Sequence, residues 1–99
     1  MKHTTLEILQ VLKDFKKENA RKYHIEVMAL FGSVARDEQS KDSDVDVCIR
    51  TNPTLDLFSL DEVREDLQRK LGVKVDLLTL HDHMRPHFRR NIERDAIYV

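Results

Sequence analysis

Apolar residues along this chain switch several times between helical and strand spacing. Between Ile8 and Phe15 they recur three or four positions apart, which predicts a first helix from about Thr5 to Arg21. The preceding Thr4-Thr5-Leu6-Glu7 has the pattern of a capping box, in which a hydroxyl and a glutamate satisfy free backbone N–H groups. His24 to Phe31 is almost continuously apolar and predicts a buried strand.

Gly32 interrupts this strand, and Ser33 can cap a short helix that continues to Asp37. A polar turn follows, and Asp44 to Arg50 then alternates strictly between apolar and other residues. This alternation predicts a second strand. One face carries Val45, Val47 and Ile49, and the other carries Asp44, Asp46 and Cys48.

The second half of the chain predicts two helices and two further strands. Ser59-Leu60-Asp61-Glu62 predicts a capped helix start, and Gly72 a helix end. The remaining predicted elements are a third strand over Val73–Leu78, a helix over Pro86–Arg94 with Phe88 and Ile92 facing inward, and a short strand over Ala96–Val99. The principal order, α-β-α-β-α-β-α, predicts an α/β (α+β) fold with a small mixed sheet and flanking helices.

Size and composition fit a single domain over residues 1–99. Hydrophobic residues make up 40% of the chain and charged residues 35%, as in globular proteins. The net charge of −1 provides no overall attraction for nucleic acid. Cys48 is the only cysteine, and we see neither a signal-peptide core nor an apolar run of membrane-spanning length, so we expect a cytoplasmic protein.

Gly32 and Ser33 form a candidate phosphate-binding turn. Glycine allows close approach of a ligand to the backbone, and the N–H groups of a following helix turn can meet a phosphate. The Ser33 hydroxyl and the Arg36 guanidinium, one turn later, could contact the same phosphates. The alternative is an ordinary strand-to-helix turn with a serine cap.

Asp44 and Asp46 form a candidate metal site, because residues two apart on a strand share a face and their carboxylates repel each other unless paired. Mg²⁺ is usually held by one or two such carboxylates together with substrate phosphates. Asp76 would join them if the third strand lies beside the second, and could bind metal or accept a proton. The alternatives are an exposed acidic edge, and an Asp76 that is paired with Lys74 or an arginine.

In combination, these residues resemble the DNA polymerase beta-like nucleotidyltransferase superfamily. Phe-Gly-Ser-x-Ala-Arg, beginning at Phe31, and Ser-Asp-x-Asp, beginning at Ser43, make the chain most similar to its minimal nucleotidyltransferases, the MNT or MntA-type antitoxins. The resemblance covers essentially the whole chain.

The resemblance implies that Gly32 and Ser33 hold the triphosphate of ATP and that Asp44 and Asp46 bind Mg²⁺. It also implies that Asp76 is the third catalytic carboxylate and that Arg36 is the usual family arginine. Asp37 departs from the pattern, since family members commonly have glycine there.

The resemblance further implies AMP transfer to a tyrosine of a cognate HEPN ribonuclease toxin, within a type VII toxin–antitoxin pair that forms a hetero-oligomer. Two alternatives remain. One is nucleotide transfer to RNA or to a small molecule. The other is a non-enzymatic antitoxin that binds nucleotide and neutralises its partner by forming a complex.

Two other groups of residues carry weaker signals. His81, His83 and His87 have some metal-ligand character, but a closed zinc site needs four ligands and surface histidines are the simpler interpretation. A basic cluster on the last predicted helix is either a solvated face or a docking surface for RNA or an acidic partner; it comprises Arg85, Arg89, Arg90 and Arg94.

Overall fold

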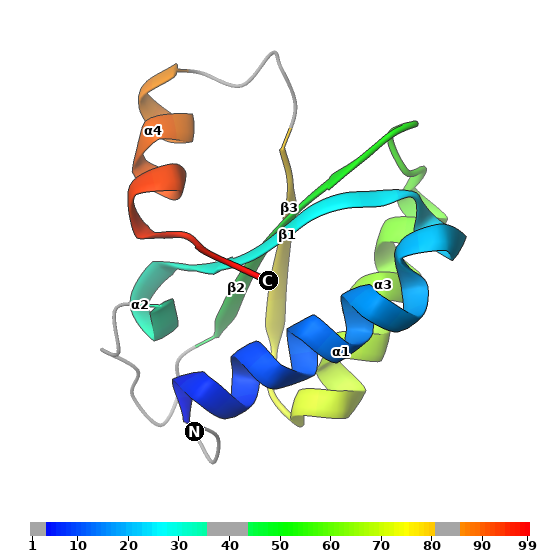
Figure 1. Ribbon diagram of the computed structural model, residues 1–99, viewed down its shortest axis with the longest axis horizontal. Helices are drawn as coiled ribbons and strands as arrows, with labels where there is room; N and C mark the ends of the chain where they lie inside the picture. Colours follow the sequence, from blue (N-terminus) through cyan, green and yellow to red (C-terminus); the bar gives the residue numbers. More distant parts are fainter. Residues whose placement is uncertain (1–3, 36–43, 81–85) are drawn as a thin grey trace.

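The computed structural model describes residues 4–35, 44–80 and 86–99. Its elements follow the order α1, β1, α2, β2, α3, β3, α4, β4 (Figure 1). Their bounds are α1 Thr5–Tyr23, β1 Ile25–Phe31, α2 Gly32–Ala35, β2 Val45–Thr51, α3 Leu57–Leu71, β3 Val75–Thr79, α4 Pro86–Asp95 and β4 Ile97–Tyr98. The α/β fold predicted from the sequence is confirmed, including the short final strand.

The four strands form one mixed sheet in the order β3-β2-β1-β4. β1 pairs antiparallel with both β2 and β4. β2 and β3 pair in parallel, and α3 supplies the crossover that parallel pairing requires. β3 therefore lies directly beside β2, which is the condition under which Asp76 was predicted to join Asp44 and Asp46.

Two apolar layers cover the two faces of the sheet. On one face α1 and α3 pack over the sheet, with Ile8, Leu12, Phe15, Val63 and Leu67 contacting the inward residues of the strands. On the other face the smaller cluster joins α4 to β1 and β2 through Ile92, Ala29 and Cys48. Figure 1 shows this arrangement, with α4 on one side of the sheet and α1 and α3 on the other.

The first helix begins and ends at the signals that the sequence contains. Thr4 is its N-cap, and the Thr4 hydroxyl accepts a hydrogen bond from the Glu7 N–H at 3.1 Å to complete the predicted capping box. The helix continues two residues beyond the predicted Arg21 and ends at His24, which adopts a left-handed conformation with φ of 55°.

The predicted start of α3 was wrong. The helix begins at Leu57, because Asp56 is the N-cap and its carboxylate accepts from the Ser59 N–H at 2.7 Å. Ser59 therefore lies in the first turn instead of capping it. The predicted end is confirmed, since Gly72 closes the helix with a φ of 68°.

Smaller differences concern α2 and α4. α2 begins at Gly32, so Ser33 lies within this short helix and is not its N-cap. The predicted burial of Ile92 is confirmed at 3% exposure, whereas the Phe88 side chain lies outside the described part of the structure. None of the described helices has the length and apolar character needed to cross a membrane.

Candidate active site

β2 places Asp46 as the strand parity predicted, but the strand begins at Val45 and not at the predicted Asp44. Val45, Val47 and Ile49 are fully buried in the core formed with α1 and α3, while Cys48 is buried in the cluster on the opposite face. Asp46 therefore shares the opposite face with Cys48. Asp44 lies one residue before the strand and is partly exposed.

The neighbouring strand brings Asp76 to the same place. In the parallel register of β2 and β3, Asp46 and Asp76 are direct partners. Neighbouring strands lie about 5 Å apart, and partners in parallel register point to the same face. The register thus places Asp76 beside Asp46, and its role as a third carboxylate of the site stays a prediction.

Gly32 lies directly against Asp46. Phe31 is the register partner of Asp46 across β1 and β2, so the following glycine meets the Asp46 side chain. A Cβ atom built on Gly32 would overlap Asp46 Oδ2 and would lie 3.1 Å from its Cγ. Gly32 also has a φ of 75°, a conformation that favours glycine. Any side chain here would displace the carboxylate, so the backbone turn and the aspartate form one unit.

We call Gly32, Asp44, Asp46 and Asp76 the aspartate site. Asp46 is partly buried and Asp76 is exposed, so carboxylates of this site face solvent. Negative charges on directly opposed strand residues repel each other, and the site therefore favours a cation.

Lys74 provides one such positive charge. Its Nζ lies 3.9 Å from Asp44 Oδ2, with 69% and 38% of the two side chains exposed. The alternative interpretation of the sequence paired Asp76 with Lys74 or an arginine, whereas the structure pairs Lys74 with Asp44. As the side chains stand, no three His, Cys, Asp or Glu residues in ranges 4–35, 44–80 and 86–99 form a group able to hold a metal ion.

Arg64 carries a further positive charge on α3, on the helix that covers the opposite face of the sheet. The pKa of the Arg64 guanidinium is raised above its ordinary value, mainly by a hydrogen bond from Arg64 to Asp61, and the charges of Asp61, Glu65 and Asp76 add to this effect. Arg64 stands on α3, beside the edge of the sheet that β3 forms. Sequence reasoning missed it because helical spacing gives no information about which strand a helix contacts.

Several predicted residues cannot be placed. Arg36 and Asp37 lie outside the described residues, as do His81, His83 and Arg85. The backbone of Ser33 lies in α2, but its side chain is also outside the description.

Ion pairs between residues of α4 partly neutralise the positive charge of this helix. Arg89 Nε lies 2.9 Å from Glu93 Oε1, and Arg94 Nε lies 3.7 Å from Asp95 Oδ1. These ion pairs favour the interpretation of a solvated helix face over that of an RNA-docking surface.

Cys48 is an unreactive neighbour of the aspartates. It is fully buried between β1, β2 and α4. Burial raises the pKa of its thiol from 9.0 to about 11, against smaller lowering effects from backbone hydrogen bonds of Cys48 and Ala29. A neutral buried thiol is a packing residue, as expected from the sequence.

The site thus consists of a glycine turn packed on a strand aspartate, with a second aspartate on the neighbouring parallel strand, as the sequence predicted for a nucleotidyltransferase. Residues 12–99 match the model of the nucleotidyltransferase domain family. The chain belongs to this family, and the predicted assignment as a nucleotidyltransferase is confirmed.

Two full-length relatives are informative. MJ0126 of Methanocaldococcus jannaschii, whose name proposes protein adenylyltransferase activity, is 38% identical over 96 residues, covering 97% of this chain and 98% of its own. Protein adenylyltransferase MntA of Thermococcus cleftensis is 30% identical over 96 residues, covering 97% of this chain and 96% of its own.

Solved structures share the fold. One described as a proposed minimal nucleotidyltransferase superposes with a TM-score of 0.77 at 28% identity, covering 98% of both chains. Two toxin–antitoxin complexes match at the level of fold alone. A complex with AMP-PNP gives a TM-score of 0.71 at 22% identity, covering 97% of this chain and 72% of that one. The complex of a tri-AMPylated Shewanella oneidensis HEPN toxin with an MNT antitoxin gives a TM-score of 0.61 at 20% identity, covering 95% of this chain and 66% of that one.

Proposed function

We propose that this protein is an Mg²⁺-dependent protein adenylyltransferase that transfers AMP from ATP to a tyrosine hydroxyl of a cognate HEPN toxin and so acts as its antitoxin. The proposal rests on the contact between Gly32 and Asp46, together with the register pairing of Asp46 and Asp76. In this arrangement a phosphate approaching the Gly32 backbone meets carboxylates at the same point.

The ligand types of the aspartate site suit a magnesium ion, but the three carboxylates would have to move together from the positions described above to bind it. Carboxylate oxygens are the hard ligands that Mg²⁺ prefers, and the absence of a side chain at Gly32 leaves room for the Asp46 carboxylate. We assign Asp44, Asp46 and Asp76 as the ligands, with Asp44 leaving Lys74 when metal binds. Bound Mg²⁺ would offset the negative charge of the triphosphate.

The protein residues position the reaction. The Gly32 backbone, the Ser33 hydroxyl and Arg36 would hold the β- and γ-phosphates, which leave as pyrophosphate. The acceptor hydroxyl oxygen forms a bond to the α-phosphorus of ATP while the bond to pyrophosphate breaks. Asp76 accepts the hydroxyl proton in our assignment. Such phosphoryl-type transfer depends mainly on positioning and on charge neutralisation.

Names carried by related proteins support a protein acceptor. Two relatives that this chain matches over nearly their full length are named for protein adenylyltransferase activity. The HEPN toxin in one structural neighbour is tri-AMPylated. We therefore favour a toxin tyrosine as acceptor, a hetero-oligomer with that toxin, and a cytoplasmic location where ATP is available.

Incubation with labelled ATP, Mg²⁺ and the product of the neighbouring gene tests this function. We expect label on the partner protein, and we expect Asp44→Asn with Asp46→Asn to abolish labelling without unfolding the protein. The matched control is Asp14→Asn on α1, away from the site, which should leave labelling unchanged.

Other outcomes would assign the site differently. Label on RNA would replace the protein acceptor with a nucleic acid. A stable complex without label would make the protein a binding antitoxin. Undiminished transfer by the double aspartate variant would exclude the aspartate site as the catalytic centre.

A further inference from the structure

The start of β3 carries a buried backbone donor on the outer edge of the sheet. β3 is an edge strand, and the Val45 N–H donates to the Lys74 carbonyl at 3.0 Å on its inner side. Because backbone groups alternate in direction along a strand, the Val75 N–H points outward. Val75 is only 1% exposed, so this N–H needs a partner within the protein.

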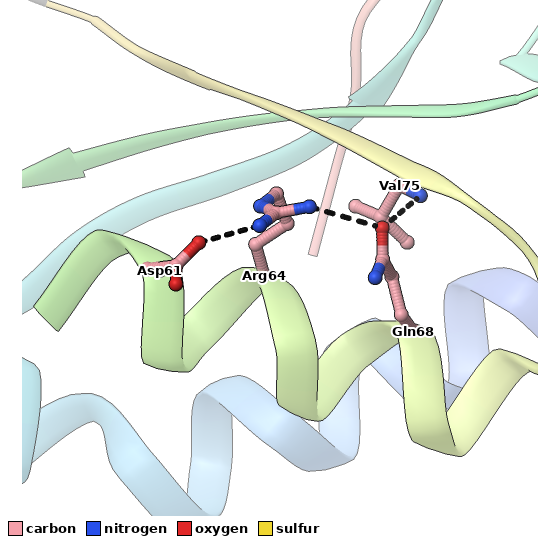
Figure 2. Close-up of polar contacts among 4 residues, drawn as sticks. All are labelled: Asp61, Arg64, Gln68 and Val75. Carbon is pink, nitrogen blue, oxygen red and sulfur yellow. Dashed lines mark hydrogen bonds and ion pairs between the residues drawn. The ribbon is translucent and has the colours of Figure 1, made fainter. Parts of the chain in front are cut away.

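Gln68 of α3 supplies that partner. Its Oε1 accepts from the Val75 N–H at 3.1 Å, and the same oxygen accepts from Arg64 Nη1 at 3.4 Å. Figure 2 shows this chain of contacts from Asp61 through Arg64 and Gln68 to the β3 backbone. Both groups that face Oε1 are donors, which fixes the orientation of the carboxamide with its oxygen toward β3.

Arg64 is itself held in place. Its Nη2 donates to Asp61 Oδ1, one turn earlier on the same helix. Gln68, Arg64 and Asp61 therefore form one connected polar group along a single face of α3. This group ends at the peptide N–H of Val75, which comes directly before Asp76.

We propose that Gln68 is a positioning residue for the aspartate site: through the Val75 N–H it fixes the start of β3 and thereby holds Asp76 opposite Asp46. The inference rests on the function proposed above, since it assigns Asp76 as a metal ligand. Arg64 supports Gln68 by donating to its carboxamide oxygen.

Manganese binding provides a measurement that does not depend on the acceptor. Mn²⁺ is titrated into the protein in the presence of AMP-PNP and followed by electron paramagnetic resonance. Gln68→Leu, which has no acceptor, should weaken Mn²⁺ binding about tenfold, the lower end of what second-sphere partners contribute to metal affinity. Gln68→Glu keeps an acceptor oxygen and should bind within about twofold of the wild type.

Gln10→Leu is the matched control, because Gln10 also lies on a helix but bonds only Asp14 of the same helix among the contacts described. It should not change Mn²⁺ binding. If Gln68→Leu does not fold, as judged by circular dichroism, Arg64→Met replaces it. The Arg64→Met variant keeps the hydrogen bond between Gln68 and Val75 but removes the hydrogen bond from Arg64 to Gln68. It should weaken Mn²⁺ binding about threefold.

The outcomes separate this inference from the proposed function. Unchanged Mn²⁺ affinity in folded Gln68→Leu, or in Arg64→Met if it is the variant used, would overturn the positioning role and leave the function intact. A wild type without Mn²⁺ binding, or with binding that Asp46→Asn does not reduce, would overturn the proposed function and this inference with it.

Discussion

At the scale of single residues, Gly32 and Gly72 make a natural comparison. Both have positive φ angles, 75° and 68°. They differ in what a side chain would meet: a Cβ on Gly32 overlaps the Asp46 carboxylate, whereas a Cβ on Gly72 meets nothing within 4 Å. The same substitution at the two positions therefore separates backbone strain from damage to the site.

We expect Gly32→Ala to lower AMP transfer about 100-fold, because displacement of catalytic groups by about 1 Å has effects of this size. Gly72→Ala should lower the free energy of unfolding by about 1–2 kcal/mol through backbone strain alone and leave transfer within twofold of wild type. Transfer assays and urea denaturation measure the two effects. Equal loss of transfer in both variants would contradict the role of the Gly32–Asp46 contact.

The residues of the site illustrate what sequence can predict. Strand parity was sufficient to place Asp46 on the face opposite to Val45 and Val47, because alternation is a local property of the backbone. The addition of Asp76 required that β3 pair with β2, which the sequence allowed but did not determine. The pairing of Lys74 with Asp44 depends on side-chain positions across two strands, and no local pattern contains that information.

At the scale of elements, the start of α3 was the main error. Ser59 to Glu62 fits the capping-box pattern, but the Asp56 carboxylate caps the helix three residues earlier. The first helical residues, Leu57 and Phe58, are 82% and 84% exposed, so they do not lie on the buried face that periodicity detects. By contrast, the start of α1 was predicted correctly because its capping box and its buried apolar residues indicate the same first turn.

Asp56→Ala should lower the thermal midpoint of unfolding at neutral pH, since the Ser59 N–H loses its acceptor. Asp56→Asn is the control and should retain most of the wild-type stability. The bond from the Ser59 backbone N–H lowers the pKa of Asp56 below 3.8, so its ionic contribution is present above that pH and disappears as the pH falls through the lowered pKa. The difference between the wild-type and Asp56→Ala midpoints should therefore narrow in strong acid, where only the ionic part of the cap is lost, as followed by circular dichroism.

At the scale of the whole molecule, the buried Cys48 thiol links stability to alkaline pH. Its pKa is raised to about 11 in the folded protein from 9.0 otherwise. Between these values the unfolded chain loses the thiol proton while the folded chain keeps it, so stability must fall as the pH rises. The full effect of a two-unit shift is about 2–3 kcal/mol.

Comparison with Cys48→Ala isolates this effect from other alkaline titrations. Urea denaturation at pH 8 and at pH 11 should give a decrease in the free energy of unfolding that is larger in the wild type by about 2 kcal/mol. Parallel decreases in the two proteins would contradict a buried neutral thiol.

The mixed sheet also has a consequence for the order of folding. The connection between the antiparallel strands β1 and β2 is shorter than the one between β2 and β3, which contains the whole of α3. Asp46 and Asp76 lie 30 positions apart in the chain, and contacts between distant positions form slowly because the intervening loop must close first. A growing chain on the ribosome thus acquires Gly32 and Asp46 before Asp76, so the carboxylate set is completed only after α3 and β3 have been synthesised.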